Sequence, residues 1–428
     1  MAGEWRERTL GELTENFDGI RVPVKEADRR SGPYPYYGAS GIVDHVDGFL
    51  FDGEYLLVAE DGENLRTRTT PIAFLAREKF WVNNHAHVVR GNHEADTRFL
   101  MYSLAAADIS GYLTGSTMPK LTQGNMNRIP LLAPPLPEQR AIAHILGTLD
   151  DKIELNRRMS ETLEAMARAL FKSWFVDFNP VRAKLEGRDP GLPKSLADLF
   201  PAHLVDSELG EIPEGWEVGS LGDFFAVGLG GAWGEDEQSN RATVAMRCLR
   251  GIDCHDLAEG RIPDVPVRWV SPKQSIDREL TEGTILIEGS GSFCGRSMIW
   301  RHAYGALLGK PVGYSNFCKR LDPRCTAAQA TICWMQVRQA YRDGLLQSFR
   351  TGTAFPNFDV HGALSNLQVV MPPVPLAEAF GEIFALSQRS DLMAQSRTLA
   401  ALRDTLLPKL ISGDLRVKDA EKFIETSA

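Results

Sequence analysis

Three segments of the first half of the chain recur in the same order in the second half, and this repeat limits the folds that the chain can adopt. The pairs are residues 5–13 (WRERTLGEL) and 216–224 (WEVGSLGDF), residues 115–121 (GSTMPKL) and 352–358 (GTAFPNF), and residues 133–138 (APPLPE) and 371–376 (MPPVPL). The offset between the copies is 211 residues at the first pair and 238 at the last. We therefore expect two related modules, with insertions in the second.

A long helical pattern follows the proline cluster of each copy, so the chain is predicted to alternate module, helix, module, helix. We expect a first module over 1–135, a central helix over 136–185, a linker and second module over 186–373, and a last helix and tail over 374–428. The length of 428 residues suggests about three domains, but two modules and two shared helices account for it.

Each module is predicted to mix strands and helices, which places the chain in the α+β class. Short apolar runs that are bounded by glycine or turn residues indicate strands at 54–59, 80–82, 86–89 and 284–287. Helical patterns at 97–107 and 327–341 lie between strands. We expect each module to be a mixed α/β unit.

The two long helices carry apolar stripes. The first is predicted over 138–176 and the second over 376–407, where Ser387 and Ser390 interrupt the stripe and Pro408 should end or kink the helix. Heptad spacing places the following residues on the first stripe: Ile142, Ile145, Leu149, Lys152, Asn156, Met159, Leu163, Met166 and Leu170. The second stripe includes Phe380, Ile383, Leu392, Leu399, Leu402 and Leu406. The stripes should bury each other in an antiparallel coiled coil, because a folded module separates the helices.

Asn156 falls in the middle of the first stripe, and two interpretations stay open. A buried Asn at such a position sets the register and the choice of partner at a cost in stability. The alternative is that the helix pair opens locally and that Asn156 is hydrated, which Lys152 on the same stripe favours.

Composition excludes several classes of protein. The formal charge of −9 disfavours a basic protein that binds nucleic acid with its whole surface, but a local basic face remains possible. We expect no secretory signal and no transmembrane helix. The six cysteines form no Cys-x-x-Cys pair, so we expect buried thiols in a reducing cytoplasm and no metal site.

No catalytic motif is complete. The Pro-Pro pairs lack the flanking residues of an amino-methyltransferase, and the glycine-rich segments at 228–233 and 305–311 lack residues that nucleotide-binding loops need. His85 and His87 are two residues apart and could bind metal or read bases, although structural hydrogen bonds are the favoured interpretation.

Two windows without acidic residues lie in matching parts of the modules, at 109–137 and 289–321. Spaced Lys and Arg without carboxylates are what a surface facing phosphates needs. Arg66 and Arg68 follow a turn at 61–62 and suit phosphate or groove contacts. The complete set of predicted DNA-binding residues is Arg66, Arg68, Arg90, Lys120, Arg128, Arg296, Arg301 and Lys310.

Five segments resemble the specificity subunits of type I restriction-modification systems. Residues 171–184 (FKSWFVDFNPVRAK) look like the central conserved region of that family, and residues 206–216 (DSELGEIPEGW) resemble the entry to its second target-recognition domain. Residues 36–43 and 54–64 resemble its first domain, and residues 406–416 resemble its C-terminal end. The resemblance covers the whole chain in order.

The resemblance implies a non-catalytic cytoplasmic subunit in which two target-recognition domains each read one half of a bipartite DNA target. Two methyltransferase subunits, and restriction subunits for cleavage, would be its partners. S-adenosylmethionine, ATP and magnesium would belong to those partners, with no cofactor bound by this chain. The modules share framework residues but otherwise differ, so the target should be non-palindromic. The helix pair should fix the half-site spacing near one DNA turn, about 34–36 Å.

Trp174 and Phe175 have two interpretations: they dock a methyltransferase subunit, or they pack the end of the helix onto a module.

Three other functions are alternatives to that of a type I specificity subunit. The first is a specificity subunit of a methyltransferase-only or type IIB-like system. The second is a nuclease or methyltransferase fused to its own recognition domains, which the missing motifs disfavour. The third is a coiled-coil scaffold that binds only protein, which the basic windows disfavour.

Overall fold

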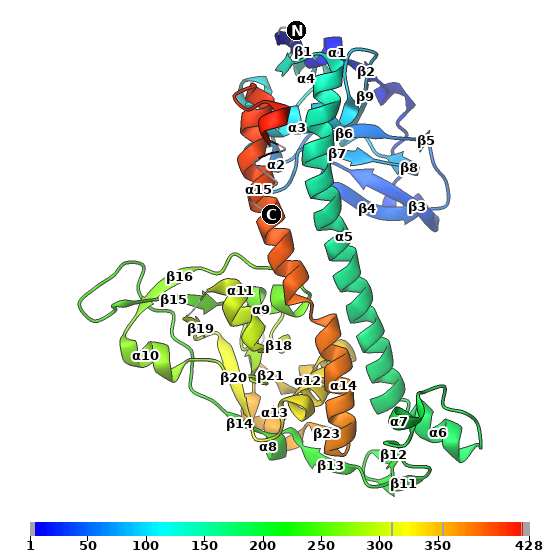
Figure 1. Cartoon of the computed structure of the whole chain (residues 1–428), viewed down its shortest axis with the longest axis vertical. Coiled ribbons are helices and arrows are strands. Elements are labelled where there is room, and N and C mark those ends of the chain that lie inside the picture. The colour runs from blue at the N-terminus through cyan, green and yellow to red at the C-terminus, as the bar shows by residue number, and fades with distance from the viewer. Residues whose placement is uncertain (1–4, 310, 353–354, 421, 423–428) are drawn as a thin grey trace. The chain divides into compact units, whose positions relative to one another are not determined.

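The computed structural model describes residues 5–309, 311–352, 355–420 and 422 of the chain (Figure 1). It divides into two compact units. Unit 1 comprises Met1–Ile153 and Thr398–Ala428, and unit 2 comprises Glu154–Arg397. Each unit is described by itself below. The division into two recognition modules and two helical segments, at 1–135, 136–185, 186–373 and 374–428, stays a prediction.

Unit 1 contains two four-stranded sheets and a short strand pair. The first sheet has the order β2-β9-β6-β7 and is antiparallel throughout. Its strands are β2 (Thr14–Asn16), β9 (Ala86–Gly91), β6 (Tyr55–Ala59) and β7 (Ala73–Ala76). The second sheet has the order β4-β3-β8-β5, in which β3 and β8 are parallel. Its strands are β4 (Gly41–Val46), β3 (Ser31–Gly38), β8 (Lys79–Val82) and β5 (Phe51–Asp52).

The first and last strands of the first module pair with each other. β1 (Arg6–Thr9) is antiparallel to β10 (Pro130–Ala133). The helices of this module are α1 (Leu10–Leu13), α2 (Asn64–Thr67), α3 (Thr97–Ala106) and α4 (Gln123–Met126), with 3-10 turns at Asp18–Ile20, Glu26–Asp28 and Ser110–Tyr112. The core of the module includes Leu56, Phe99 and Met126, which are fully buried.

Unit 2 repeats this topology. Its four-stranded sheet has the order β14-β20-β17-β18, and a three-stranded sheet has the order β16-β15-β19, in which β15 and β19 are parallel. The strands are β14 (Phe225–Val227), β20 (Cys318–Pro323), β17 (Ile285–Glu288), β18 (Ser297–Ile299), β16 (Val267–Val270), β15 (Val244–Leu249) and β19 (Val312–Tyr314). β13 (Glu217–Ser220) is antiparallel to β23 (Gln368–Met371), as β1 is to β10.

The remaining elements of unit 2 are helices and short strands. The helices are α6 (Asn179–Leu185), α7 (Lys194–Ala197), α8 (Leu221–Phe224), α9 (Gly251–Ala258), α10 (Pro272–Asp277), α11 (His302–Leu308), α12 (Ala327–Arg342) and α13 (Val360–Asn366), with a 3-10 turn at Leu345–Phe349. The short strands are β11 (Leu204–Ser207), β12 (Gly210–Pro213), β21 (Arg350–Thr351) and β22 (Asn357–Phe358). The strands and helices predicted within the modules are confirmed to within one or two residues.

The repeat and its insertions are confirmed in detail. Thr9 and Glu12 form a capping box at the start of α1, and Ser220 and Asp223 form the same box at α8, which explains the first repeated segment. Two of the insertions replace tight connections. β3 reaches β4 through residues 39–40, whereas β15 reaches β16 through α9, and β7 reaches β8 through residues 77–78, whereas β18 reaches β19 through α11.

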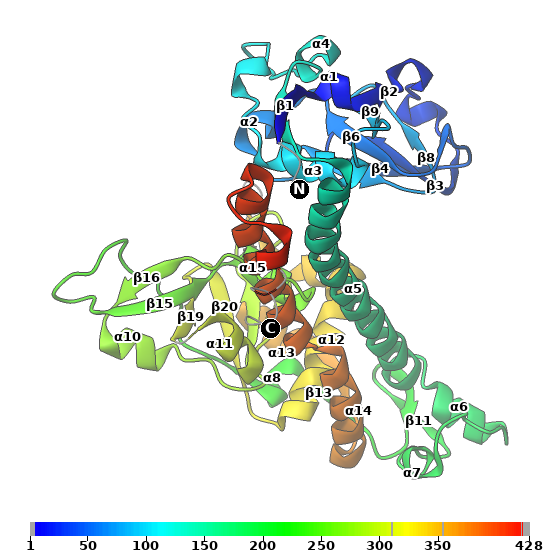
Figure 2. The ribbon, with the colours of Figure 1, turned by 45° about the horizontal axis from the view of Figure 1, so that its top comes forward.

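The first long helix is α5 (Leu136–Phe175), as predicted to within two residues. In unit 1 its first turns lie beside the end of α15 (Ser390–Ser412), as both views show (Figures 1 and 2). Asp150 pairs with Arg403 at 2.7 Å, and Glu138 pairs with Arg416 at 3.0 Å. The residue numbers of the partners fall, from Arg416 to Arg403, as those of α5 rise from Glu138 to Asp150. The two segments are therefore antiparallel. The predicted positions Ile142, Ile145, Leu149 and Leu406 are buried, while Leu399 and Leu402 are half-buried against the same core.

Unit 2 shows the same direction of pairing. The Asn156 amide donates to Gln395 Oε1 at 2.8 Å and to Ser396 Oγ at 3.3 Å, and the Phe171 ring lies 6.0 Å from that of Phe380 in α14 (Val374–Ser387). Asn156 is 1% exposed, so the buried interpretation is confirmed. The helix pair closes around this polar layer.

The predicted stripe is wrong at three positions of α5, because Lys152, Met159 and Met166 are exposed. An α-helix has 3.6 residues per turn, so a stripe with a period of 3.5 drifts about 20° per heptad. After Asn156 the buried face moves to Glu164 and Ala167, which leaves Leu163 half-buried.

The second helix was predicted as one element, but it is two. α14 ends at Ser387, whose hydroxyl donates to the carbonyl of Phe384 at 2.7 Å, and α15 begins at Ser390. Local hydrogen bonds of this kind compete with the helix. Of the two expectations for Pro408, that it ends the helix is wrong, and that it kinks the helix stays a prediction. α15 continues to Ser412, and Leu406 and Leu410 bury its last turns in the core of unit 1.

Candidate nucleic-acid interface

Three loops of unit 1 meet at one end of its antiparallel sheet, and we call this place junction 1. It consists of residues 60–64 after β6, residues 83–85 before β9, and residues 114–121. Three backbone hydrogen bonds hold it together. Gly62 N donates to Pro119 O at 3.1 Å, Glu60 N donates to His85 O at 2.9 Å, and Leu121 N donates to Glu60 O at 2.8 Å.

Unit 2 builds the same arrangement, which we call junction 2, from residues 288–296 after β17, residues 315–317 before β20 and the described residues of 350–358. The three equivalent hydrogen bonds are present. Gly291 N donates to Pro356 O at 2.9 Å, Gly289 N donates to Phe317 O at 2.7 Å, and Phe358 N donates to Gly289 O at 2.9 Å. The repeated Gly-x-x-x-Pro motif of the sequence therefore belongs to a backbone framework that both modules share.

Glycine is required at the start of this motif. Gly115 has φ +85° and Gly352 has φ +81°, a region that favours glycine because it has no Cβ. A Cβ on Gly115 would lie 2.2 Å from the carbonyl oxygen of Met118. The tight loop that results leaves Met118 63% exposed and Phe355, at the matching position, 79% exposed.

The side chains at the two junctions differ. Junction 1 presents polar pairs: His85 Nδ1 lies 2.8 Å from Asp61 Oδ2, and Lys120 Nζ lies 3.2 Å from Glu60 Oε1. Junction 2 instead exposes three phenylalanines: Phe293, Phe317 and Phe355. Exposed apolar and hydrogen-bonding side chains on a fixed backbone do not serve the core. They suit contacts with thymine methyl groups and base edges in a DNA groove.

A buried ionic network supports junction 1 from below. His87, which is 1% exposed, contacts Asp18 Oδ2 at 2.6 Å through Nδ1 and Leu121 O at 2.8 Å through Nε2. Burial raises the pKa of Asp18, but hydrogen bonds from His87 and from the Val88 amide outweigh burial, so that the pKa is lowered. His87 therefore has the structural role that the sequence favoured.

Glu60 links this network to the surface. Burial raises its pKa, but the Arg21 guanidinium at 2.9 Å, the charge of His87 and the hydrogen bond from Lys120 together lower it. Glu60 is thus held as a carboxylate while its backbone bonds to both neighbouring loops.

The predicted DNA-binding residues of unit 1 fall into two groups. Arg66 and Lys120 lie at junction 1, where the Arg66 guanidinium donates to Gly115 O at 3.0 Å. The other three lie away from it. Arg68 donates to the carbonyls of residues 105 and 107, Arg90 lies over the Tyr55 ring, and Arg128 donates to the Asn125 side chain. None of these contacts tests DNA binding, so the five stay predictions.

In unit 2, Arg296 lies at junction 2 and pairs with Glu288 at 2.8 Å. Arg301 is mostly buried and links Glu282 to Thr331 of α12, which gives it a structural task in the module. Lys310 lies outside the described residues. As DNA contacts all three stay predictions.

Sequence reasoning missed the exposed phenylalanines and three arginines of unit 2, Arg168, Arg338 and Arg342. A usable signal existed for Phe293 and Phe317, because both lie in the acid-free window at 289–321 and each directly precedes a cysteine. The arginines had none, since α5 and α12 are distant in sequence.

Trp174 and Phe175 are buried inside unit 2. The Trp174 ring contacts the Phe200 ring at 5.3 Å, and the Phe175 ring contacts the rings of Phe380 at 5.0 Å and Trp216 at 5.7 Å. Both side chains therefore pack the end of α5 onto the second module, which is one of the two interpretations. Docking of a partner by these two side chains stays an untested prediction, and their burial argues against it.

All six cysteines are free, and five of them are buried. Among the described residues, no group of His, Cys, Asp and Glu side chains is arranged to hold a metal ion. Within the same residues, no helix is both long enough and apolar enough to span a membrane.

Comparisons with known proteins agree on one family. Residues 2–165 match the family model of the type I restriction modification DNA specificity domain. The chain is 40% identical over 147 residues to the type I restriction enzyme specificity subunit designated S.HindORF215P of Haemophilus influenzae, a match that covers 34% of this chain and only 37% of that protein. It is 22% identical over 439 residues to the MjaIX specificity subunit of Methanocaldococcus jannaschii, with 97% of this chain and 94% of that protein covered.

The fold has a counterpart among solved structures. The S subunit of the type I restriction-modification system of M. genitalium superimposes with a TM-score of 0.60 and 17% sequence identity, and the match covers 95% of this chain and 96% of that one. This likeness establishes a shared fold. The domain match and the nearly full-length sequence match show that the chain is similar in sequence to type I restriction enzyme specificity subunits.

Proposed function

We propose that this chain is the DNA sequence-specificity subunit of a type I restriction-modification complex. Junction 1 and junction 2 each read one half of a bipartite, non-palindromic target. The chain itself carries out no chemistry. It directs adenine methylation by two methyltransferase subunits and cleavage by restriction subunits, and those partners would use S-adenosylmethionine, ATP and magnesium.

One observation carries the proposal. The same three backbone hydrogen bonds build both junctions, yet the exposed side chains differ at matching positions, Met118 against Phe355 and His85 against Phe317. A fixed protein backbone that carries different exposed side chains is suited to the recognition of two different DNA sequences. Contacts with base edges specify the sequence, whereas contacts with the DNA phosphates position the protein.

The test is to co-express the chain with its methyltransferase partner and to map the methylated adenines. A bipartite motif is expected. Met118→Ala should relax or change one half of the motif, and Phe355→Ala should relax or change only the other half. Ile276→Ala, at an exposed apolar residue of α10, is the matched control and should leave the motif unchanged. An active methyltransferase without any bipartite motif would refute the proposal.

A further inference from the structure

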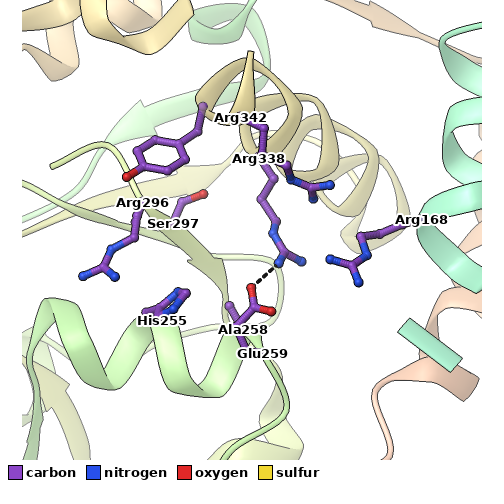
Figure 3. A pocket seen from close by; sticks show the side chains of 9 residues that line it. Arg168, His255, Ala258, Glu259, Arg296, Ser297, Arg338 and Arg342 are labelled. Carbon is purple, nitrogen blue, oxygen red and sulfur yellow. Dashed lines mark hydrogen bonds and ion pairs between the residues drawn. The ribbon is translucent and has the colours of Figure 1, made fainter. Parts of the chain in front are cut away.

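Unit 2 contains a pocket lined by arginines, which we call the arginine pocket. It has a volume of about 270 Å³. Four elements line it. α5 supplies Arg168, α9 and its end supply His255 and Glu259, Arg296 directly precedes β18, and α12 supplies Arg338 and Arg342. Figure 3 shows Arg168, Arg338 and Arg342 on one side, with His255 and Arg296 on the other.

Two of the four arginines are neutralised within the protein. Arg338 is buried and donates to Glu164 at 3.1 Å and to Glu259 at 2.7 Å. Arg296 pairs with Glu288 at 2.8 Å. Glu259 is the one carboxylate among the described residues that line the pocket, and Arg338 occupies it, so the other two arginines have no carboxylate of their own there.

Arg168 and Arg342 therefore supply the unbalanced positive charge. Within the described part of the chain, Arg168 pairs only with Glu164, at 3.7 Å, and that carboxylate already pairs with Arg338. Arg342 makes no ion pair or hydrogen bond with any residue that the structure describes. Burial lowers the pKa of Arg342, and the charges of Arg338 and Arg168 lower it further. Crowded guanidinium groups raise the free energy of the empty pocket, and a bound anion would relieve this.

The fold does not require this charge. In unit 1 a cavity of about 500 Å³ lies at the matching place, between α3 and α15 and beside the start of β7, just as the arginine pocket lies between α12 and α5 beside the start of β18. Its lining holds two arginines: Arg403 is paired with Asp150 and Asp404, and Arg68 donates to the carbonyls of residues 105 and 107. Four arginines line the pocket of unit 2, whereas two arginines and two aspartates line the cavity of unit 1.

We propose that the arginine pocket binds a phosphate group through Arg168 and Arg342. Planar guanidinium groups match the geometry of phosphate oxygens and bind them with paired hydrogen bonds. The volume of about 270 Å³ is large enough to admit one such group.

The phosphate belongs to the backbone of the DNA strand that passes junction 2, and this part rests on the proposed function. Arg296 joins the two places, because it lines the pocket and pairs with Glu288 of junction 2. The window 289–321, which contributes to both places, contains no carboxylate that would repel the strand. Free inorganic phosphate offers the same chemistry and is the alternative source.

The test uses the full chain and the double variant Arg168→Gln with Arg342→Gln. Neither residue holds a buried ion pair alone, so the fold should survive, and circular dichroism checks this. Arg342→Lys keeps the charge without the planar fork and should act in the same direction, more weakly. Arg182→Gln, at an exposed arginine of α6, is the matched control. Binding to a duplex of random sequence is measured against salt, and binding of inorganic phosphate is measured by calorimetry.

For a DNA phosphate, the double variant should bind the duplex about tenfold more weakly at low salt, and its salt slope should fall by about one to two, while the control matches the wild type. If inorganic phosphate binding is lost but the salt slope is unchanged, the phosphate site stands and DNA as its source is refuted. If neither changes in a folded variant, the proposal is overturned, although sequence-specific methylation would still uphold the proposed function. If the wild-type chain alone binds no duplex, DNA as the source of the phosphate is refuted and the phosphate measurement alone decides the pocket, while the methylation motif separately decides the proposed function.

Discussion

Junction 1 and junction 2 have the same backbone and different surfaces. In both, a strand end, a turn and a Gly-x-x-x-Pro loop are joined by three equivalent hydrogen bonds. Junction 1 then places polar pairs of Lys120 and His85 on this backbone, whereas junction 2 places exposed phenylalanines there. The contrast separates what the fold needs from what is free to vary. The hydrogen-bonded frame is constant, and the variable tips are where recognition can be encoded.

The largest effect is expected where unit 2 differs most from unit 1, at the buried ion pairs of Arg338. Arg338→Ala leaves Glu164 buried with only the more distant Arg168, at 3.7 Å, and should lower the free energy of unfolding by about 3–5 kcal/mol. Chemical denaturation of the full chain measures this. Changing both residues, with Arg338→Met and Glu164→Leu, should recover most of the loss. A single variant as stable as the wild type would contradict the structure.

The next largest effect is expected at the glycines that begin the two Gly-x-x-x-Pro loops, and it tests whether both positions leave equally little room for a Cβ. Gly115→Ala should destabilise the chain by about 1–3 kcal/mol, because the new Cβ would meet the Met118 carbonyl oxygen at 2.2 Å in a strained backbone. Gly352→Ala should cost less, about 1 kcal/mol, since the nearest atom, the Phe355 oxygen, is 3.1 Å away. Thermal unfolding compares them. Gly111→Ala, which meets open space, is the control, and equal losses at all three positions would refute the difference.

A smaller effect is expected from acid, and it should be located at junction 1. The pKa values of Asp18 and Glu60 are lowered in the folded protein. Their stabilisation is therefore present above the unfolded pKa values, about 3.9 and 4.3, and is lost as the pH falls through the lower folded values. Asp18→Asn should flatten the decline in stability below about pH 4. A variant whose acid profile parallels that of the wild type would show that Asp18 contributes nothing.

The smallest effect on stability should accompany the clearest effect on specificity. Phe355→Ala removes an exposed side chain and should change the free energy of unfolding by less than about 0.5 kcal/mol. The control is Leu345→Ala, another exposed apolar position of unit 2. A large loss of stability at Phe355 alone would mean that the fold needs this side chain and that it is not free to vary.

The sequence was sufficient to predict the architecture because the repeat and the apolar patterns are local signals. The strands at β6 and β17 and the helices α3 and α12 follow from short runs of residues, and the antiparallel helix pair follows from their stripes. The stripe was less accurate beyond Asn156, since heptad counting ignores the drift of a straight helix. The break at Ser387 and the continuation through Pro408 depend on tertiary packing that overrides local preference.

The candidate sites depended on contacts between distant segments, and these the sequence could not supply. Gly62 and Pro119 bond across 57 residues of chain, and Arg168 and Arg342 line one pocket from two helices. The basic windows indicated the correct regions of both modules. They could not distinguish Lys120, at junction 1, from Arg301, which is mostly buried and tied to Glu282 and Thr331.

The backbone bonds of the junctions have a consequence for the entropy of binding. Gly62 and Gly291 lie in surface loops, yet their amides are hydrogen-bonded to Pro119 and Pro356. Such loops are ordered before any ligand arrives, so little of the interaction energy is consumed in immobilising them. Hydrogen exchange at these two amides should accordingly be slow for loop positions. A preorganised frame also allows a single tip residue to be replaced while the geometry of its neighbours is kept.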